Sequence, residues 1–233
     1  INMCGINGFS FKDKNLISKM HDYIKNRGPD SSGNYLDDDI SLGHTRLSVI
    51  DTDPRADQPL EYKNLIIVYN GEIYNYLYLR KKLIDLKVKL KTFSDTEVIV
   101  ALFDLFGVNS FKMLSGIFAL SIWDKKKKKL YLLRDIIGVK PLYYKIDGES
   151  ENIFFSSSIN ALKISNQKNE LSDNAFYFYQ NLGRNDSYES FIKGIFKLNP
   201  GELIVFKNKK IILKKKILKF NFRKNKLSNN DIK

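Results

Sequence analysis

Apolar residues in this chain occur in many short runs, and this pattern restricts the fold more than any other feature of the sequence. Runs at residues 65–69, 117–123 and 203–206 have the length of strands and end at turn-forming or charged residues. None approaches the roughly 20 residues that a membrane-spanning helix needs, which argues against a membrane protein. With 233 residues and 43% hydrophobic content, the chain can bury a substantial core and is not a disordered protein.

The runs alternate with a few segments of helical spacing. They predict strands at residues 3–9, 34–36, 40–45, 65–69, 117–124, 130–134, 142–145, 153–156, 203–206 and 211–213. Helical spacing predicts helices at residues 16–25, 76–86, 98–106 and 173–181. We expect residues 117–156 to form an antiparallel meander and Asn70-Gly71 to end its strand in a turn. Strands grouped around amphipathic helices indicate a layered α+β fold.

The net charge of +13 raises the question of nucleic-acid binding. Of the 39 basic residues 32 are Lys and 7 are Arg, whereas base and phosphate recognition favours Arg. The lysines lie in separate clusters, and residues 125–129 fit a solvated hairpin turn between two strands. We therefore expect no nucleic-acid partner. One domain is expected at residues 1–206. Residues 207–233, whose composition turns to Lys and Asn from Lys214 onward, are expected to be a basic linker or tail.

Cys4 is the only cysteine, which excludes a disulfide within the chain. The residues before it do not resemble a secretory signal, so we expect a cytoplasmic protein. A thiol nucleophile needs a base, and neither His21 nor His44 has an evident supporting partner in sequence. If Cys4 were N-terminal, its own α-amine, which titrates at about 7.7 to 8.0, could accept the proton. The alternative is a small buried residue at the start of a strand.

Five motifs around and after this cysteine occur in one order. They are Met3-Cys4-Gly5-Ile6-Asn7-Gly8, Arg27-Gly28-Pro29-Asp30, Arg46-Leu47-Ser48-Val49-Ile50-Asp51, Asn70-Gly71-Glu72-Ile73-Tyr74-Asn75 and Ser94-Asp95-Thr96-Glu97, with a further similar stretch from Arg134-Asp135 to Gly138-Val139-Lys140-Pro141-Leu142-Tyr143-Tyr144. From Met3 to about Phe206 the chain resembles class II glutamine amidotransferases, which are N-terminal nucleophile hydrolases. The second and fourth motifs have the form found in the glutaminase half of glutamine-dependent asparagine synthetases.

The resemblance implies a four-layer αββα sandwich of two antiparallel sheets and a defined set of site residues. Cys4 would be the nucleophile, and the Asn70 side chain with the Gly71 backbone N–H would hold the oxyanion. Arg46 would bind the α-carboxylate of glutamine, and Asp95, helped by Glu72, its α-ammonium. Main-chain groups at Leu47 and Val49 would form pocket walls. A glycine at position 71 would let the backbone approach the ligand closely.

Structural roles for the same residues remain open at this point. Asp95 could cap its helix, since Ser94 and Glu97 fit a capping box just before the helical segment. Arg46 could be a surface pairing partner, and Asn70-Gly71 an ordinary hairpin turn. Arg27 lies in a Gly-Pro break and is more simply structural than a substrate ligand.

The resemblance implies that the chain hydrolyses glutamine to glutamate and ammonia, for asparagine synthesis from aspartate and ATP by a synthetase domain outside this chain. The Ser-Gly-Gly-x-Asp-Ser loop of that domain does not occur in the sequence. ATP and Mg belong to that domain, and the glutaminase half-reaction needs no metal or organic cofactor. The expected partners are L-glutamine and the synthetase domain or subunit, with no nucleic acid and no membrane; a homodimer stays open.

One feature keeps an alternative function open. Ile1-Asn2-Met3 precede Cys4, and while they are attached the nitrogen of Cys4 is an amide that cannot act as a base. We expect the active form to begin at Cys4, after trimming. The alternative is a catalytically silent amidotransferase-like domain with a regulatory or assembly role.

Overall fold

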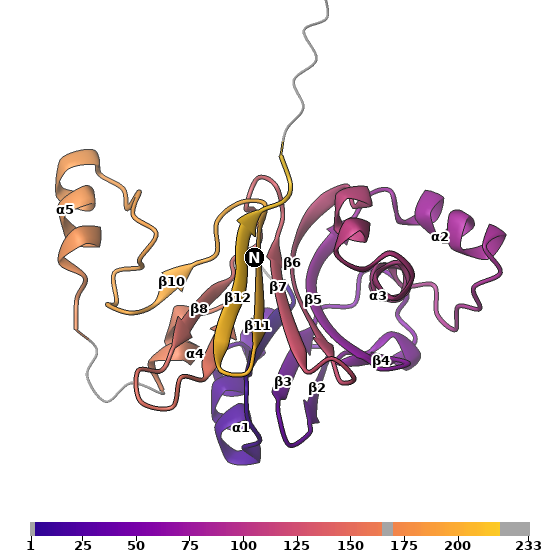
Figure 1. The fold of residues 1–233 in the computed structure, drawn as a ribbon, viewed down its shortest axis with the longest axis horizontal. Helices are drawn as coiled ribbons and strands as arrows, with labels where there is room; N and C mark the ends of the chain where they lie inside the picture. Colours follow the sequence, from indigo (N-terminus) through magenta and orange to yellow (C-terminus); the bar gives the residue numbers. More distant parts are fainter. Residues whose placement is uncertain (1–2, 165–169, 220–233) are drawn as a thin grey trace, which may run out of the picture.

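The computed structural model describes residues 3–164 and 170–219, and its elements form four layers (Figure 1). Two antiparallel sheets pack face to face, and helices cover the outer face of each. This is the αββα sandwich that the resemblance implied. The basic residues at 223–226 lie outside the described residues, as do Ile1 and Asn2.

The first sheet contains six strands and carries the Cys4 end of the chain. In spatial order they are β10 (Phe196–Lys197), β8 (Tyr143–Ile146), β9 (Ile153–Ser156), β1 (Gly5–Phe9), β3 (Ser41–Arg46) and β2 (Ser31–Leu36). β1 lies between β9 and β3, with Gly5 opposite Thr45. The β2–β3 hairpin turns at the acidic residues 37–39, between the strands predicted at residues 34–36 and 40–45. Cys4 therefore enters a central strand of this sheet.

The second sheet also contains six strands. In spatial order they are β12 (Lys210–Lys216), β11 (Glu202–Lys207), β7 (Lys129–Arg134), β6 (Gly116–Asp124), β5 (Leu65–Ile73) and β4 (Leu60–Tyr62). The lysines at residues 125–128 form the predicted β6–β7 turn. β4 was not predicted, because only Leu60 of its three residues is buried. The edge strand β12 is largely exposed and rich in lysine, which disfavours pairing with other chains.

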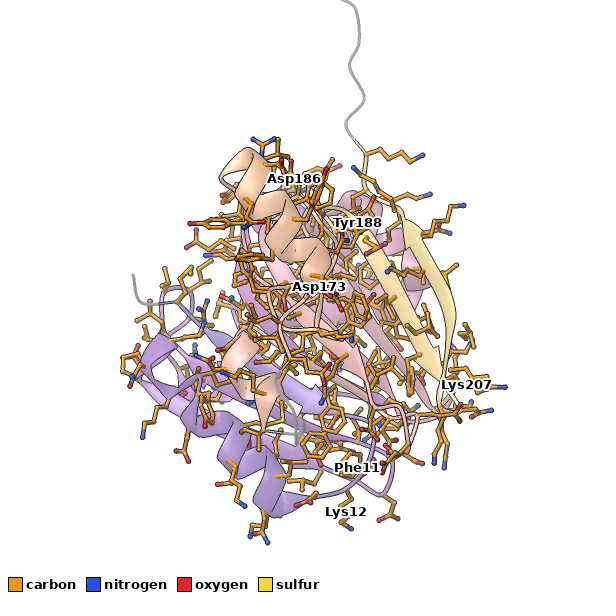
Figure 2. All side chains as sticks on the ribbon, turned by 90° about the vertical axis from the view of Figure 1, so that its left-hand side faces the viewer. Phe11, Lys12, Asp173, Asp186, Tyr188 and Lys207 are labelled. Atoms are coloured by element: carbon orange, nitrogen blue, oxygen red, sulfur yellow. The ribbon has the colours of Figure 1, made fainter. Side chains whose placement is uncertain are left out.

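Helices on the outer faces explain the remaining helical patterns. They are α1 (Lys14–Asp22), α2 (Tyr76–Asp85), α3 (Asp95–Phe106), α4 (Ile159–Lys163) and α5 (Asp173–Leu182), with 3₁₀ turns η1 (Lys25–Arg27), η2 (Pro54–Ala56) and η3 (Gly107–Met113). α2 and α3 cover the second sheet, and α1 and α4 cover the first. α5 stands away from the sheets, with Asp173 at its start and Asp186 just beyond its end (Figure 2). Within the described residues, every helix is too short or too polar to span a bilayer.

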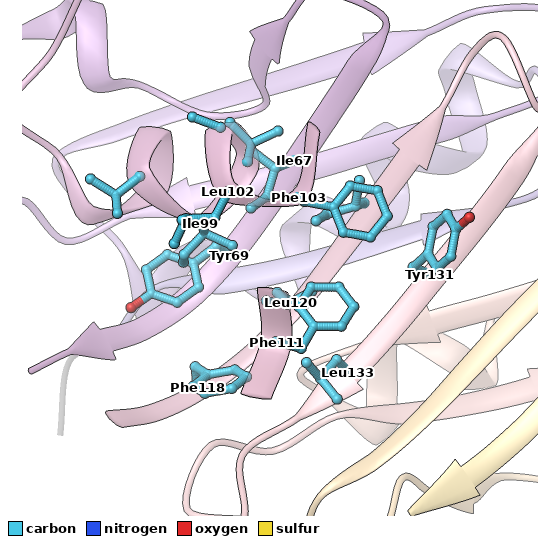
Figure 3. Close-up of a cluster of buried hydrophobic side chains, with 14 of the residues drawn as sticks. Ile67, Tyr69, Ile99, Leu102, Phe103, Phe111, Phe118, Leu120, Tyr131 and Leu133 are labelled. Atoms are coloured by element: carbon cyan, nitrogen blue, oxygen red, sulfur yellow. The ribbon is translucent and has the colours of Figure 1, made fainter. Parts of the chain in front are cut away.

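Three apolar clusters hold the layers together. The largest lies between the second sheet and α3, where Phe103 stacks against Phe111 and meets Tyr131 edge-on (Figure 3). A second cluster fills the space between the sheets, and a third joins the first sheet to α1 and α4. Burying a large apolar side chain contributes about 1.5–3 kcal/mol, so these clusters fix the sheets against each other.

Two local predictions were wrong. Asn70-Gly71 do not form a turn: they lie inside β5, opposite Ala119 and Phe118 of β6. Nine residues of pairing with β6 outweigh the local turn preference of the dipeptide. The expected meander over residues 117–156 is also split. β6 and β7 pair in the second sheet, whereas β8 and β9 pair in the first, so the chain changes sheets after Arg134.

The folded part extends past the boundary expected from composition. β12 pairs with β11 in register from Glu202 opposite Lys216, and Leu218 is buried in the core cluster beside the second sheet. The strand predicted at residues 211–213 thus lies within β12, which extends the folded domain into the segment at residues 207–233 that was expected to be a linker or tail. The lysines face solvent on an edge strand, so their composition resembles that of a linker.

Candidate active site

A cavity of about 250 Å³ opens beside the start of β1, and it brings together residues from both sheets and from α3. Each of the eight predicted site residues lines it: Cys4, Arg46, Leu47, Val49, Asn70, Gly71, Glu72 and Asp95. These residues span more than ninety positions of sequence, from Cys4 to Asp95. The sandwich is therefore the device that assembles the site.

The Cys4 sulfur lies against the backbone of Leu47. Sγ accepts a hydrogen bond from Leu47 N at 3.3 Å and donates to Leu47 O at 3.6 Å. Burial raises the pKa of the Cys4 thiol, while the Leu47 N–H and the charges of Arg46 and Lys140 act in the opposite direction. A thiol with a raised pKa is neutral at rest, so its reaction requires a base.

The Arg27-Gly28-Pro29-Asp30 motif supports this end of the chain. Arg27 Nε donates to the Cys4 carbonyl at 3.2 Å, and Met3 N donates to the Arg27 carbonyl at 2.7 Å. A Cβ at Gly28 would lie 2.4 Å from the backbone of Thr45, so only glycine packs there. Asp30 accepts from Ser48 N at 2.7 Å. The motif thus fixes both Cys4 and the loop that follows β3.

Asn70 supplies a free hydrogen-bond donor to the cavity. The residue is 1% exposed, and no acceptor among the described residues meets its Nδ2. A buried donor without a partner costs about 1–3 kcal/mol. Such a donor in a cavity beside a thiol is suited to a substrate oxygen.

Gly71 lines the cavity, but the reason for its glycine differs from the expected one. A Cβ at this position would lie 2.2 Å from the Ile117 carbonyl and 2.6 Å from Phe118 Cα, both on β6. The missing side chain therefore lets β6 approach β5. Close approach of a ligand is not what excludes a side chain here.

Arg46 is buried and engaged within its own loop. Nη1 contacts Asp57 Oδ1 at 2.5 Å and Asp53 O at 3.2 Å, and Nη2 donates to the carbonyls of Ile50 and Asp51. The guanidinium is 6% exposed, so it is not a surface pairing partner. It holds the 47–57 loop that carries Leu47 and Val49. A substrate carboxylate would have to exchange with one of these acceptors or approach the Nε edge.

Asp95 begins α3 and faces the cavity rather than capping its helix. Its Oδ2 accepts from Tyr69 OH at 2.8 Å and from Ile73 N at 3.1 Å. Burial raises the pKa of Asp95, and these hydrogen bonds oppose that shift. Ser94 is the cap, since its Oγ accepts from Glu97 N at 3.2 Å.

The capping box is only half formed. The Glu97 carboxylate accepts from Lys91 N and from Thr92 N and Oγ1, and it therefore ties the loop before α3 to the helix. It does not return to Ser94 N, as the reciprocal motif requires. Ser94 therefore supplies the side-chain cap, and Asp95 lines the cavity.

Neither histidine is placed to be the base. His44 is fully buried on β3, where Nε2 contacts the Tyr69 carbonyl at 3.1 Å, and burial lowers its pKa to about 3. His21 belongs to α1, on the outer face of the first sheet, and neither ring lines the cavity. Among the described residues, no cluster of His, Cys, Asp and Glu could hold a metal ion.

Three cavity residues were missed by sequence reasoning. Tyr69 binds Asp95, and Gln58 accepts from Tyr69 N at 2.6 Å while its Nε2 donates to Thr96 at 3.3 Å. Lys140 lies after the change of sheet and faces Met3. Tyr69 directly precedes Asn70 and Lys140 lies in a quoted motif, so both were within reach. Gln58 has no motif that marks it.

The model of a family described as "Glutamine amidotransferase domain" matches residues 3–217. A protein of Methanocaldococcus jannaschii that is assigned as a glutamine-hydrolysing asparagine synthetase is 38% identical over 230 residues, covering 88% of this chain and 44% of its own length. Glutamine-hydrolysing asparagine synthetase 1 of Bacillus subtilis is 32% identical over 231 residues, covering 95% of this chain and 36% of its own length. The chain thus spans less than half the length of either relative.

Similarity among solved structures supports the fold. Glutamine phosphoribosylpyrophosphate amidotransferase of Bacillus subtilis superposes with a TM-score of 0.67 at 18% identity, covering 91% of this chain and 49% of that one. At this identity the likeness concerns the fold alone. Since the family model covers nearly the whole described chain, and relatives above 30% identity align over most of it, the chain belongs to the glutamine amidotransferase domain family.

Proposed function

We propose that this chain hydrolyses the side-chain amide of glutamine and supplies the ammonia to a synthetase domain that makes asparagine from aspartate and ATP. The observation that carries the proposal is the meeting of the Cys4 thiol with the unpartnered Asn70 Nδ2 in one cavity. Family membership and the names of the relatives support the substrate and the acceptor.

The first half of the mechanism forms a thioester. With Cys4 at the N-terminus, its α-amine takes the thiol proton, directly or through a water. The sulfur attacks the side-chain carbonyl carbon of glutamine, and the oxyanion rests on Asn70 Nδ2 and the Gly71 N–H. The α-ammonium then protonates the leaving nitrogen. The C–N bond breaks, and ammonia departs.

The second half releases glutamate. Water attacks the γ-glutamyl thioester, the α-amine accepts its proton, and the same oxyanion site stabilises the second tetrahedral intermediate. The thiol leaves with that proton, which restores the resting enzyme. We propose that this half-reaction uses no metal or organic cofactor, and that ATP and Mg serve only the synthetase domain.

Substrate orientation would come from the two charged ends of the cavity. Asp95, with Glu72, would bind the α-ammonium of glutamine, and Arg46 its α-carboxylate. Tyr69 and Gln58 would hold Asp95 and β5 in place, since both are hydrogen-bonded within the cavity wall.

The test is a glutaminase assay on protein that starts at Cys4. A gene that encodes Met directly before Cys4 would yield this form by aminopeptidase trimming, and mass spectrometry would verify the first residue. We expect glutamate and ammonia in equal amounts, and no activity in the Cys4→Ala variant. An active chain that still carries Ile1 would contradict the α-amine mechanism. An inactive, folded chain that begins at Cys4 would favour the silent, regulatory alternative.

A further inference from the structure

Lys140 is a buried cation beside the nucleophile. The residue is 9% exposed, lines the cavity, and its Nζ donates to Met3 Sδ at 3.2 Å. None of the ion pairs found among the described residues involves Lys140. A thioether is a weak acceptor, and a buried ammonium without a counter-ion is costly. The position of this charge therefore calls for a functional reason.

The chain is built to keep Lys140 in this place. Arg134 Nε donates to the Lys140 carbonyl at 2.7 Å, and the Asp135 carboxylate accepts from Lys140 N at 3.2 Å. Arg134 also binds the carbonyls of Gly138 and Leu198. Both Arg134 and Asp135 are buried. The turn that carries the chain between the sheets thus clamps the backbone on both sides of Lys140, and the side chain reaches the residue bonded to Cys4.

Charged and titratable side chains face the Cys4 end from several elements. They are Arg27 of η1, Arg46 of β3, Tyr69 and Glu72 of β5, Asp95 of α3, Tyr143 of β8, and Lys140 itself. Arg46 is paired with Asp57. Arg27 donates Nε to the Cys4 carbonyl, and its buried Nη2 has no hydrogen-bond partner among the described residues. Asp95 accepts from Tyr69 OH, and its charge acts on the pKa of the Cys4 thiol in the direction opposite to that of Lys140. Lys140 remains as the cation whose contact here is with the Met3 side chain.

We propose that the Lys140 ammonium keeps the α-amine of Cys4 in its neutral, proton-accepting form. The inference rests on the proposed function, in which Cys4 is the first residue. Loss of Met3 removes the sulfur that now contacts Nζ and leaves the ammonium near the new terminus. A second positive charge beside it is disfavoured. An α-amine ordinarily titrates at about 7.7 to 8.0 and is mostly protonated at neutral pH. Lys140 thereby raises the fraction of the Cys4 α-amine that is neutral and can act as a base. It does so without touching the substrate and is therefore a positioning residue.

The first test is the pH profile of kcat/KM for glutamine, measured on chains that begin at Cys4. In Lys140→Met the midpoint of the acidic limb should rise by roughly one pH unit, because the amine is protonated more easily. Lys140→Arg retains the charge and should retain the midpoint. Lys145→Met is the matched control: it removes a buried lysine that packs on Phe154 outside the cavity, and its profile should match the parent. An unmoved midpoint in Lys140→Met overturns the inference.

The second test needs no turnover. In the Cys4→Ser background, the pH dependence of reductive methylation at the N-terminus reports the α-amine directly, with the N-terminal peptide quantified by mass spectrometry. The midpoint should rise when Lys140 is replaced by Met, or by Gln if the Met variant does not fold. If the midpoint shifts here while the parent chain that begins at Cys4 does not hydrolyse glutamine, the proposed function is defeated but the role of Lys140 is not. If the parent chain hydrolyses glutamine and the midpoint does not shift, the role of Lys140 is defeated but the proposed function is not.

Discussion

At the scale of single residues, the site combines an unpartnered polar group with polar groups that already have partners. Asn70 Nδ2 is buried and free, whereas Asp95 and Arg46 are already engaged by Tyr69 and Asp57. An unpartnered group can bind a ligand directly, whereas a hydrogen-bonded or ion-paired group is held in position by its partner. Identifying a residue type at a motif position does not distinguish these two conditions, because the partners come from distant segments.

Replacing Asn70 by Ala should remove one oxyanion donor. We expect kcat for glutamine hydrolysis to fall by roughly 10²- to 10³-fold with little change in KM, because the oxyanion exists only after attack. Asn64→Ala is the matched control, since Asn64 is exposed and its backbone carbonyl, which accepts from Lys125 N, is retained. Steady-state kinetics check both variants. A rise in KM without a fall in kcat would assign Asn70 to ground-state binding.

His44 should make stability depend on pH. Burial lowers its folded-state pKa from 6.5 to about 3. As pH falls below about 6.5, the unfolded chain takes a proton that the folded chain refuses, so stability is lost. The loss is about 1.4 kcal/mol per pH unit.

Urea unfolding measures this effect. Between pH 7 and pH 5 the free energy of unfolding should fall by about 2 kcal/mol less in His44→Gln than in the parent. At pH 8 the histidine is neutral in both the folded and the unfolded chain. The difference in the free energy of unfolding between variant and parent at that pH therefore gives the pH-independent cost of the substitution. Equal slopes in the two proteins would show that His44 does not titrate on unfolding in this range.

At the scale of elements, the start of a helix and the turn between the two sheets position functional side chains. Ser94 caps α3 and thereby orients Asp95, the first residue of the helix. The turn after β7 moves the chain from one sheet to the other and clamps Lys140. In both places a local hydrogen-bonding motif serves a cavity that is built by remote strands.

The effect of the α3 cap on glutamine binding can be separated from its effect on stability. Ser94→Ala should cost about 1 kcal/mol in stability and raise the KM for glutamine several-fold, because Asp95 loses its fixed start. Ser172→Ala removes the corresponding cap of α5, where Oγ accepts from Ala175 N at 3.2 Å. It should cost a similar free energy and leave KM unchanged, since no residue of α5 lines the cavity. Thermal unfolding and steady-state kinetics together decide the matter.

At the scale of the whole molecule, two sheets close on one cavity, and the chain covers less than half of the relatives it matches. Under the proposed function, this cavity releases ammonia from glutamine. The Ser-Gly-Gly-x-Asp-Ser loop that the synthetase domain uses for ATP is not in the sequence. The proposal thus assigns the production of ammonia to this chain and its use to a separate synthetase domain.

This division predicts the products of the chain as it stands. Supplied with glutamine, aspartate, ATP and Mg, the chain trimmed to residues 4–233 should release glutamate and ammonia but form no asparagine. Amino-acid analysis of the reaction measures both outcomes at once. Asparagine in this mixture, with Cys4→Ala as the blank, would contradict the separation of the two activities.

The sequence was sufficient for the layered α+β class and most strands, because apolar periodicity is a property of short segments. Its motifs indicated the eight cavity residues only through the resemblance to a known family. It misplaced Asn70-Gly71 in a turn, ended the domain before β12, and joined four strands into one meander. Only the tertiary structure decided these points, as it decided that Gly71 makes room for β6 and that Arg46 is already paired. Strand pairing and burial are set by contacts between segments far apart in the chain, and such contacts leave no mark on the residues next to them in sequence.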